Sequence, residues 1–446
     1  MTSELSPTVY IETYGCQMNA SDSELMLGRL AEYGYRAVSG PEGADVILVN
    51  TCAIRDHAEQ RVLGRIGELK RHMKASTVLG VTGCMAQRLG PRLLDRAKHV
   101  DLVIGPDGYR ALPSLIESAR HGERLAKVDF DLEEHYEDFR ARRLDGVTAW
   151  IPVQRGCDYR CTYCIVPTTR GPERSRALSD VVREARETAA DGITEITLLG
   201  QTVNSYNDGT HDFADLLRAV GSVPGVRRLR FTSPHPNDFS ARVIEAMATT
   251  GAVCEHVHLP MQSGSSTTLK RMLRRYTREE YRECVARLRA AIPGLALTTD
   301  IIVGFPGETE EEFAETLDMV SETGFDDAYT FKFSAREGTP ATRLPESWTI
   351  SDEVASERLE RLIATVRAGT RAINLGMLGT RHEVLVEKLS RRGTLLQART
   401  RHHRTVLIPG DDSMIGRYVT VELTGTTGST FTGAVVPTRA ALPLAG

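Results

Sequence analysis

Residues 156–164 read GCDYRCTYC and space three cysteines as Cys157-x3-Cys161-x2-Cys164, directly after the apolar run AWIPVQ at 149–154. A structural zinc site normally takes four protein ligands, usually from two paired clusters. Three thiolates within eight residues, with no fourth beside them, instead suit a cubane iron–sulfur cluster whose fourth iron carries no protein ligand. The motif alone does not distinguish a zinc site from an iron–sulfur cluster, so the rest of the chain has to decide between them.

The size and composition of the chain predict a globular protein of several domains. Its 446 residues, 41% hydrophobic and 26% charged, are enough for about three domains with a buried core. The start carries Glu4 and no basic, apolar leader, and the most apolar later window, 290–304, is interrupted by Pro293 and Asp300. We therefore expect a cytoplasmic protein without membrane association. In that reducing compartment the eight cysteines are expected to be ligands or nucleophiles rather than disulfides.

The charge is unevenly distributed along the chain. Residues 380–446 hold nine Lys and Arg against five Asp and Glu, whereas the whole chain has a net charge of −4. A basic tail on an acidic body favours a polyanionic partner for the tail. The alternative is an ordinary solvated surface, since the excess is modest.

Residues 8–105 alternate between strand and helix patterns. Apolar strand patterns occur at 8–15, 44–50, 76–83 and 100–105, and helical patterns at 21–35, 55–73 and 92–99. In the first helix we expect Ser21 or Asp22 as the N-cap. Strands rich in Val, Ile and Leu that alternate with helices predict a parallel sheet in an α/β layer fold.

Three cysteines follow three of these strands by one or two residues. Cys16, Cys52 and Cys84 are separated by 36 and 32 residues, each about one βα unit. The carboxyl ends of parallel strands meet at one edge of a sheet, where ligands bind, so we expect the three thiols to converge. The alternative is that they are buried small apolar side chains, the usual place of a free cysteine.

Residues 147–335 contain six further strand patterns with helical stretches between them. The strands are expected at AWIPVQ, EITLLG, RRLRFT, HVHLPM, LALTTDIIVG and AYTFKF. Repeated βα units of this length predict a barrel or partial barrel, in which chemistry lies on the loops after the strands. The GCDYRCTYC stretch follows the first strand and so lies where the barrel rule places a site.

Residues 380–436 show only short strand patterns, separated by turns that contain Gly or Pro. Five short strands in fewer than 60 residues predict a small β-barrel, an arrangement that often binds RNA or single strands. A helix-prone stretch at 351–376 joins this part to the preceding barrel.

These motifs together resemble a known enzyme family. GCDYRCTYC resembles the cluster motif of radical S-adenosylmethionine enzymes, whose fold is a partial (β/α) barrel. TYGCQMNASDSE, VNTCAIRDHAEQR and GCMAQR resemble the N-terminal cysteine motifs of the methylthiotransferases within that class. The similarity continues through CIVPTTRGPERSR, LPMQSGSSTTLKRMLRRYT, TDIIVGFPGETEEEF and FSAREGTPA, and covers about residues 8–437. The C-terminal part resembles the TRAM domain, an RNA-binding module.

The resemblance implies domains, cofactors and an activity. The domains are expected at 8–124 (methylthiotransferase domain), 143–373 (radical S-adenosylmethionine barrel) and 376–438 (TRAM). The family's pattern places one [4Fe–4S] cluster, with S-adenosylmethionine on its open iron, on Cys157, Cys161 and Cys164. A second [4Fe–4S] cluster, the sulfur donor or carrier, is implied on Cys16, Cys52 and Cys84.

The implied reaction is methylthiolation of carbon 2 of N(6)-dimethylallyladenosine at position 37 of tRNA, beside the anticodon. CQMN and TTRGPERSR resemble the branch that acts on isopentenylated tRNA adenosine. The expected partners are that tRNA and a one-electron donor such as flavodoxin or ferredoxin, and the expected state is a monomer. The alternatives are a threonylcarbamoyladenosine tRNA or a ribosomal-protein aspartate as substrate, or a non-catalytic metal-bearing RNA-binding module.

Further residues are candidates for cofactor binding. Tyr163 resembles the aromatic residue that packs on the cofactor's adenine. Gly200 and Gln201 end the second barrel strand, where a small residue permits close ligand approach, although a plain turn also needs one. Gln262 and Ser263 follow the fourth strand and are expected to line the pocket or to be ordinary loop residues.

Two positions depart from the family pattern: Thr168, where we expect an aromatic residue, and Thr202, where we expect Asn. His256 and His258 alternate on one strand, but two histidines without further ligands make a poor metal site. Cys254 and Cys284 lie outside both triplets and are expected to be buried apolar side chains.

In the tail we expect basic side chains to contact RNA phosphates. The candidates are Arg391, Arg392, Arg399, Arg401 and Arg404.

Overall fold

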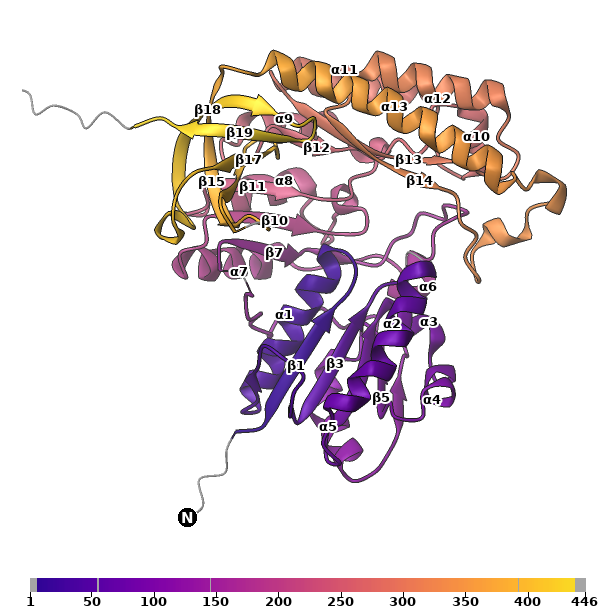
Figure 1. Ribbon diagram of the computed structural model, residues 1–446, viewed down its shortest axis with the longest axis vertical. Helices are drawn as coiled ribbons and strands as arrows, with labels where there is room; N and C mark the ends of the chain where they lie inside the picture. The colour runs from indigo at the N-terminus through magenta and orange to yellow at the C-terminus, as the bar shows by residue number, and fades with distance from the viewer. Residues whose placement is uncertain (1–5, 54–55, 145, 392, 438–446) are drawn as a thin grey trace, which may run out of the picture.

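The computed structural model describes residues 6–53, 56–144, 146–391 and 393–437, which form three domains. In Figure 1 the N-terminal α/β domain lies below the central domain, and the C-terminal β-barrel packs against one side of the central domain. The fold class predicted from the sequence is confirmed for each part. No helix in the described ranges is both long enough and apolar enough to cross a membrane.

The N-terminal domain is built on a six-stranded sheet in the order β2-β1-β3-β4-β5-β6, with every pairing parallel. Its strands are β1 (Thr8–Thr13), β2 (Arg36–Ala37), β3 (Val46–Thr51), β4 (Val78–Gly83), β5 (Leu102–Ile104) and β6 (Leu125–Lys127). Its helices are α1 (Gln17–Glu32), α2 (Asp56–Leu69), η1 (Lys70–His72), α3 (Cys84–Leu89), α4 (Arg92–Arg96), η2 (Tyr109–Ala111) and α5 (Leu112–Arg120). The sequence patterns did not predict the short edge strands β2 and β6.

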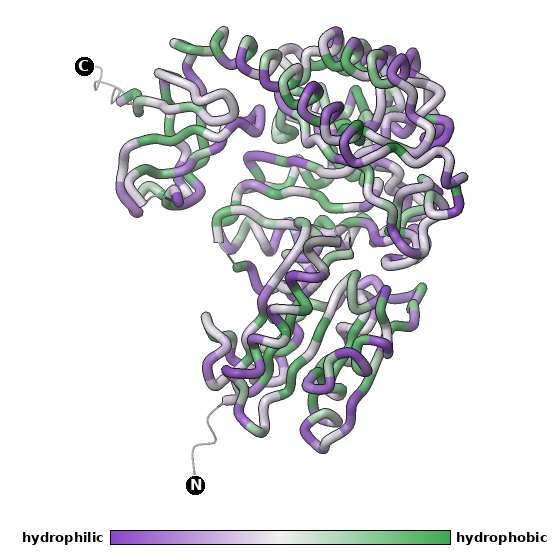
Figure 2. The backbone as a smooth tube through the Cα atoms, turned by 45° about the vertical axis from the view of Figure 1, so that its right-hand side comes forward, coloured by the Kyte–Doolittle hydropathy of each residue, from purple (hydrophilic) through white to green (hydrophobic). Residues whose placement is uncertain are grey.

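Helices cover both faces of this sheet, which is why β3 and β4 are buried throughout. Val46 and Leu48 point into the core under α1 and α5, whereas Ile47 and Val49 point into the core under α2, α3 and α4. Neighbouring residues of a strand face opposite sides, so a continuous apolar run fills both cores. Figure 2 shows hydrophobic stretches along these strands and along those of the central domain.

The first helix begins earlier than its capping pattern predicts. Helix α1 starts at Gln17 with Cys16 as its N-cap residue, so the prediction of Ser21 or Asp22 at this position is wrong. Both side chains are instead buried within the helix, and Asp22 forms ion pairs with Arg155 and Arg170 of the central domain. Asp22 therefore pairs with side chains of another domain, whereas the capping rule assumes that it pairs with backbone N–H groups at the start of its own helix.

The central domain is a partial barrel of parallel strands. β7 (Thr148–Pro152), β10 (Glu195–Leu199) and β11 (Arg228–Phe231) form one sheet, and β12 (His256–His258), β13 (Ala296–Val303) and β14 (Asp327–Lys332) form the other. A bridge between Leu229 and Val253 joins the two sheets. All six strands predicted from the sequence are present. The connecting helices are α6 (Val166–Arg170), α7 (Leu178–Ala190), α8 (Phe213–Gly221), α9 (Ala241–Thr249), α10 (Ser266–Arg271), α11 (Arg278–Ala291) and α12 (Glu310–Thr323).

Helix α13 (Asp352–Gly376) connects the central domain to a closed five-stranded barrel in the order β15-β16-β17-β19-β18. Its strands are β15 (Arg381–Leu389), β16 (Leu396–Thr400), β17 (Thr405–Ile408), β18 (Tyr418–Thr426) and β19 (Thr430–Val435). These match the five predicted strands. Alternate apolar residues such as Val384, Val386 and Phe431 fill the barrel interior.

Candidate active site at the junction of two domains

Cys157, Cys161 and Cys164, here called the loop trio, lie on the loop between β8 (Gln154–Arg155) and helix α6. This loop follows β7 at the carboxyl-terminal end of the central barrel, as the barrel rule predicts. Gly156 makes the turn into the loop at φ +78°, and a Cβ there would lie 1.8 Å from the carbonyl oxygen of Pro172. The loop therefore requires a glycine at this position.

Cys157 and Cys164 of the loop trio are desolvated thiols, and the sulfur atoms of Cys161 and Cys164 accept hydrogen bonds. Burial raises the pKa of Cys157, and burial raises the pKa of Cys164 to about 12, with the charges of the neighbouring cysteines adding to both shifts. Thiols in such a place ionise when a metal provides the opposing positive charge. Arg274 donates to Cys161 Sγ at 3.5 Å and the Val166 backbone N–H to Cys164 Sγ at 3.5 Å, the kind of hydrogen bonds that tune a cluster. The donor set fits a cluster held by three thiolates.

Cys16, Cys52 and Cys84, here called the sheet trio, meet at the carboxyl edge of the N-terminal sheet. Cys16 precedes α1, Cys52 follows β3, and Cys84 begins α3 directly after β4. A Cβ on Gly15 would lie 2.5 Å from Cys52 Cβ, and one on Gly83 would lie 2.5 Å from the Thr51 carbonyl oxygen. The glycines before Cys16 and Cys84 thus let adjacent strand ends approach one another closely.

The electrostatics of the sheet trio also fit thiolate ligands. A hydrogen bond with the Cys52 thiol and the positive charge of Arg170 lower the pKa of Cys16 to about 6. The N–H groups at the start of α1 contribute to this shift, as expected for a cysteine at a helix N-terminus. Burial raises the pKa of Cys84, against the lowering effect of Arg170.

Within the described ranges, no three Cys, His, Asp or Glu side chains are placed to hold one metal ion together.

Arg170 and Ile165 connect the two trios across the domain junction. Arg170, at the end of α6, donates through Nε to Cys84 Sγ at 3.2 Å and through Nη2 to Asp22 Oδ2 at 2.7 Å. Ile165, next to Cys164, packs in one apolar cluster with Cys84 and Ala53. The loop that carries one trio thus contacts the other trio directly.

The candidate cofactor residues lie around the loop trio in different ways. Tyr163 packs on an apolar cluster that includes Met272 and Phe305. A Cβ on Gly200 would lie 2.7 Å from Gln154 Oε1, so the chain does need a small residue there. The Oε1 atom of Gln201 is buried without a hydrogen-bond partner among the described residues. Such an acceptor suits a ligand's ammonium group, because an unsatisfied buried polar atom is costly.

Gln262 and Ser263 differ from each other. Gln262 is buried in the left-handed region at φ +66° and forms a bridge with Ile301 of β13. The Ser263 hydroxyl faces Thr316 Oγ1 of α12 at 3.3 Å and accepts the Ser265 backbone N–H. The contacts of Ser263 therefore lie within the protein, and its role in cofactor binding stays a prediction.

The two departures from the family pattern have different surroundings. Thr202 Oγ1 lies 3.2 Å from Cys157 Sγ, so the threonine at this position contacts a sulfur atom of the loop trio. Thr168 Oγ1 donates to the Ile165 carbonyl oxygen within the first turn of α6.

The sequence patterns missed two residues close to the loop trio. His235, four residues beyond the end of β11, stacks on the ring of Tyr159 from the cysteine loop with centroids 3.9 Å apart. Burial lowers the pKa of His235 to about 2, so the ring is neutral. Burial raises the pKa of Glu173, which accepts the Ser205 hydroxyl, to about 7. His235 follows a barrel strand as Gly200 does, and the same rule applied to every strand end would have found it.

The two strand histidines and the two cysteines outside the trios belong to the central domain. His256 Nε2 and His258 Nδ1 both face Thr298 Oγ1, at 3.1 and 3.0 Å. Cys254 and Cys284 are buried.

Three of the tail arginines form ion pairs within the protein, and RNA contact by the tail arginines stays a prediction. Arg399 pairs with Glu387 of the same barrel, Arg401 with Glu255 at 2.8 Å, and Arg404 with Asp326. Glu255 and Asp326 belong to the central domain, so these guanidinium groups hold two domains together. Arg391 is exposed, and Arg392 lies outside the described residues.

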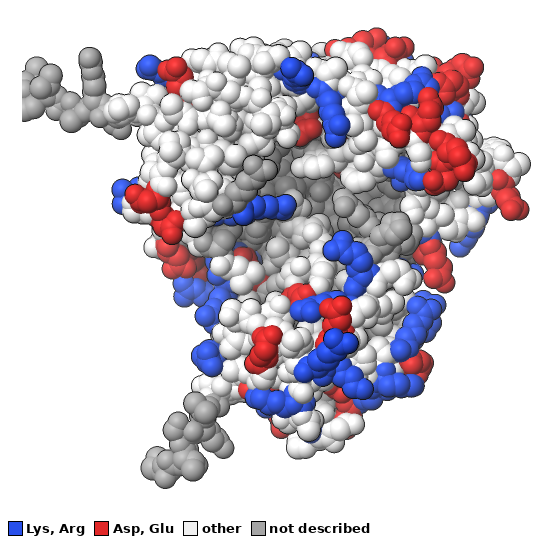
Figure 3. Space-filling view, in the orientation of Figure 1, with Lys and Arg blue, Asp and Glu red and all other residues white. Residues whose placement is uncertain are grey.

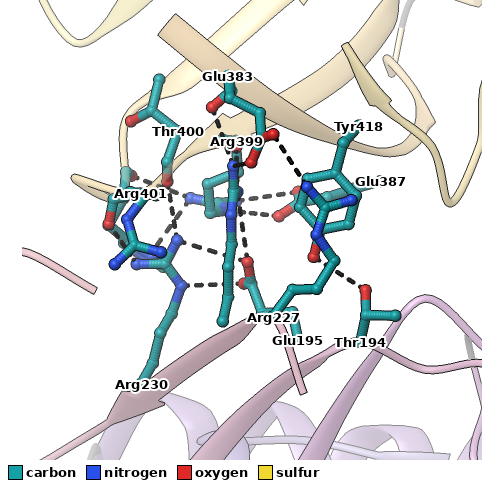
Figure 4. A network of polar contacts seen from close by, with 12 residues as sticks. Thr194, Glu195, Arg227, Arg230, Glu383, Glu387, Arg399, Thr400, Arg401 and Tyr418 are labelled. Carbon is teal, nitrogen blue, oxygen red and sulfur yellow. Dashed lines mark hydrogen bonds and ion pairs between the residues drawn. The ribbon is translucent and has the colours of Figure 1, made fainter. Parts of the chain in front are cut away.

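The central domain contributes two buried arginines, Arg228 and Arg230, to the same interface, and Figure 4 labels Arg230. Arg228 donates to the carbonyl oxygens of Arg399 and Glu383 at 2.8 and 2.9 Å. Arg230 donates to those of Thr400 and Arg401, both at 2.8 Å. Glu195 supplies the counter-charge, 2.9 Å from Arg230 and 3.5 Å from Arg228. The C-terminal barrel is therefore firmly docked at the starts of the central strands.

Three family models match the chain in the same order as its domains. They are described as the uncharacterized protein family UPF0004 over residues 8–105, the radical SAM superfamily over 151–320 and the TRAM domain over 376–436. A solved structure of the radical S-adenosylmethionine methyltransferase TsrM from Kitasatospora setae resembles the chain with a TM-score of 0.58 at 16% identity, covering 76% of this chain and 77% of that one. At that identity the likeness shows the fold alone.

Much closer relatives match over nearly the whole length. The tRNA-2-methylthio-N(6)-dimethylallyladenosine synthase of Acetivibrio thermocellus is 44% identical, covering 93% of this chain and 88% of the relative. A protein of the same name from Alkaliphilus oremlandii is 45% identical, with 93% and 89% covered. Fold and site define a radical S-adenosylmethionine enzyme, with an iron–sulfur cluster and S-adenosylmethionine as its cofactors. Within this class, the chain belongs to the family of the tRNA-2-methylthio-N(6)-dimethylallyladenosine synthases.

Proposed function

We propose that this protein inserts a methylthio group at carbon 2 of N(6)-dimethylallyladenosine at position 37 of tRNA, beside the anticodon. The observation that carries the proposal is the meeting of the two cysteine trios at one domain junction, linked by Arg170 and Ile165. A base that enters this junction is within reach of both trios. The family's relatives favour this substrate over a threonylcarbamoyladenosine or a protein aspartate.

We assign one [4Fe–4S] cluster to each trio. A cluster held by the loop trio, with S-adenosylmethionine, would supply the one-electron chemistry needed to break an unactivated C–H bond. The sheet trio would hold the second cluster, from which sulfur is delivered. The protein itself positions the substrate, excludes water and holds the two cysteine trios in a fixed position relative to each other.

The chain's residues then have distinct tasks. Gln201 Oε1 accepts a hydrogen bond from the ammonium group of S-adenosylmethionine, and Gly200 lets that group approach the strand end. Tyr163 offers an apolar ring to the adenine. Arg274 and Thr202 orient the sulfur atoms of Cys161 and Cys157. The target base leaves its stack to enter the junction, which an anticodon loop permits at low cost.

The remaining partners follow from the chemistry. Radical formation consumes one electron, so we propose flavodoxin or ferredoxin as the donor. We further propose that the protein acts as a monomer in the cytoplasm, since each chain carries both trios.

Anaerobic turnover tests the proposal, with 5′-deoxyadenosine and methylthiolated nucleoside quantified in the same reaction. Cys161→Ala should abolish both products. A Cys16→Ala/Cys52→Ala/Cys84→Ala variant should still form 5′-deoxyadenosine but no methylthiolated nucleoside. Cys284→Ala, outside both trios, is the matched control and should form both. Methylthiolated product from the triple variant would refute the role assigned to the sheet trio.

A further inference from the structure

A run of positive charge covers one outer face of the N-terminal domain. The segments 61–74 and 91–99, which include most of α2, all of η1 and all of α4, contain eight Lys and Arg against two Asp and Glu. Figure 3 shows Lys and Arg predominating over this part of the domain, in contrast to the acidic surface over the helices at the top of the view. The chain as a whole is acidic, so this concentration is local.

The two segments form one continuous surface. Both pack their apolar sides on the same core, through Ile66 and Leu69 of α2 and Leu93 of α4. His99, after α4, hydrogen-bonds through Nε2 to the carbonyl oxygen of Ile66 at 2.9 Å. The exposed cations of the two segments, here called the basic ridge, are Arg61, Lys70, Arg71, Lys74, Arg92, Arg96 and Lys98.

Much of the charge on the basic ridge is not neutralised within the protein. Lys98 lies 3.7 Å from Asp95, and Lys74 lies 3.4 Å from Asp45. Lys70, Arg71 and Arg96 are exposed and have no carboxylate partner among the side chains that the structure describes. Unpaired, solvated cations on neighbouring elements suit a partner with regularly spaced negative charges.

The basic ridge begins beside the candidate active site. Helix α3 starts at Cys84, and α4 follows it after two residues. Arg88 and Arg92, on these helices, approach Glu337 of the central domain at 3.3 and 3.8 Å, so the ridge starts at the domain junction and extends away from it. A nucleic acid that inserts one base at the junction has its backbone beside this surface.

We propose that the basic ridge binds the phosphate backbone of the substrate tRNA. The inference rests on the proposed function for the identity of the RNA. Arg401 and Arg404 of the C-terminal barrel are engaged with the central domain, so the basic ridge would add phosphate contacts to those open to exposed cations of that barrel such as Arg391. An acidic electron-donor protein is the competing partner for the same charges.

The test is tRNA binding by full-length, cluster-reconstituted protein without turnover, measured over a range of salt concentrations with tRNA that carries dimethylallyladenosine. Lys70→Ala/Arg71→Ala should weaken binding about tenfold and lower the salt slope by about 2, because each lost phosphate contact contributes about one unit. Arg287→Ala/Arg289→Ala on α11 removes two exposed cations far from the basic ridge and should leave binding unchanged. Lys70→Arg/Arg71→Lys keeps the charge and should bind like the unaltered protein.

Two results would overturn the inference. One is unchanged affinity and unchanged salt slope in Lys70→Ala/Arg71→Ala. The other is a Lys70→Ala/Arg71→Ala variant with unchanged tRNA affinity that loses turnover with flavodoxin but keeps turnover with dithionite. That result would assign the basic ridge to the electron donor. The binding assay does not depend on catalysis. A failure of the methylthiolation reaction would therefore count against the proposed function, and the tRNA-binding result could still be interpreted.

Discussion

Replacing Asp22 by Asn should open the junction between the N-terminal and central domains. The Asp22 carboxylate is fully buried, and its oxygens lie 2.7 Å from Arg170 and 3.4 Å from Arg155, both nearly fully buried. Asn keeps the shape but removes the charge, so two buried guanidinium groups lose their counter-ion. Removing one partner of a buried ion pair costs about 3–5 kcal/mol. At a factor of ten for each ~1.4 kcal/mol, this raises the open population of the junction by a factor of about 10² to 4 × 10³.

Native-state hydrogen exchange at the amides of α3 and α6 measures this opening, because those helices pack against each other across the junction. Glu422→Gln is the control. It removes the charge from an exposed pair with Arg381, whose side chains are 64% and 41% exposed, and should cost less than about 1 kcal/mol. A double-mutant cycle with Arg170→Met should show a coupling energy of about 0.5–3 kcal/mol. Exchange in Asp22→Asn within threefold of the unaltered protein would show that the ion pairs do not hold the junction closed.

Three further predictions concern the C-terminal barrel and the cysteine loop. Glu195→Gln leaves the buried Arg230 of the barrel interface without a counter-charge and should raise proteolytic cleavage in the segment after α13 about 10²-fold. Cleavage equal to that of Glu422→Gln would contradict this. His256 and His403 stack across the same interface, and burial lowers their pKa values well below 6.5. The undocked state therefore binds more protons than the docked state, so docking should weaken as the pH falls below about 6.5. Hydrogen exchange in β16 at pH 7.5 and 5.5 checks this, and equal protection at both would refute it. Gly156→Ala forces the cysteine loop away from Pro172 and should abolish iron binding at the loop trio, seen as half the iron of the unaltered protein after reconstitution; full iron content would show that the loop tolerates a side chain.

The sequence by itself determined the elements and most of the candidate site. Its strand and helix periods predicted the α/β domain, the six-stranded partial barrel and the closed β-barrel, because each apolar pattern is tied to a local geometry of period 2 or 3.6. The strand-end rule also predicted that Cys16, Cys52 and Cys84 converge, since the ends of parallel strands share an edge whatever the rest of the chain does.

Only the tertiary structure decided how the domains meet. Asp22 was predicted as a helix cap and proved to be the buried partner of Arg155 and Arg170, and Arg401 and Arg404 pair with carboxylates of the central domain rather than facing solvent. The sequence around a charged residue does not show whether its partner is water, a phosphate or a carboxylate more than a hundred residues away. That choice depends on which surfaces the folded domains bury against each other, because burial makes an unpaired charge costly and so selects its partner.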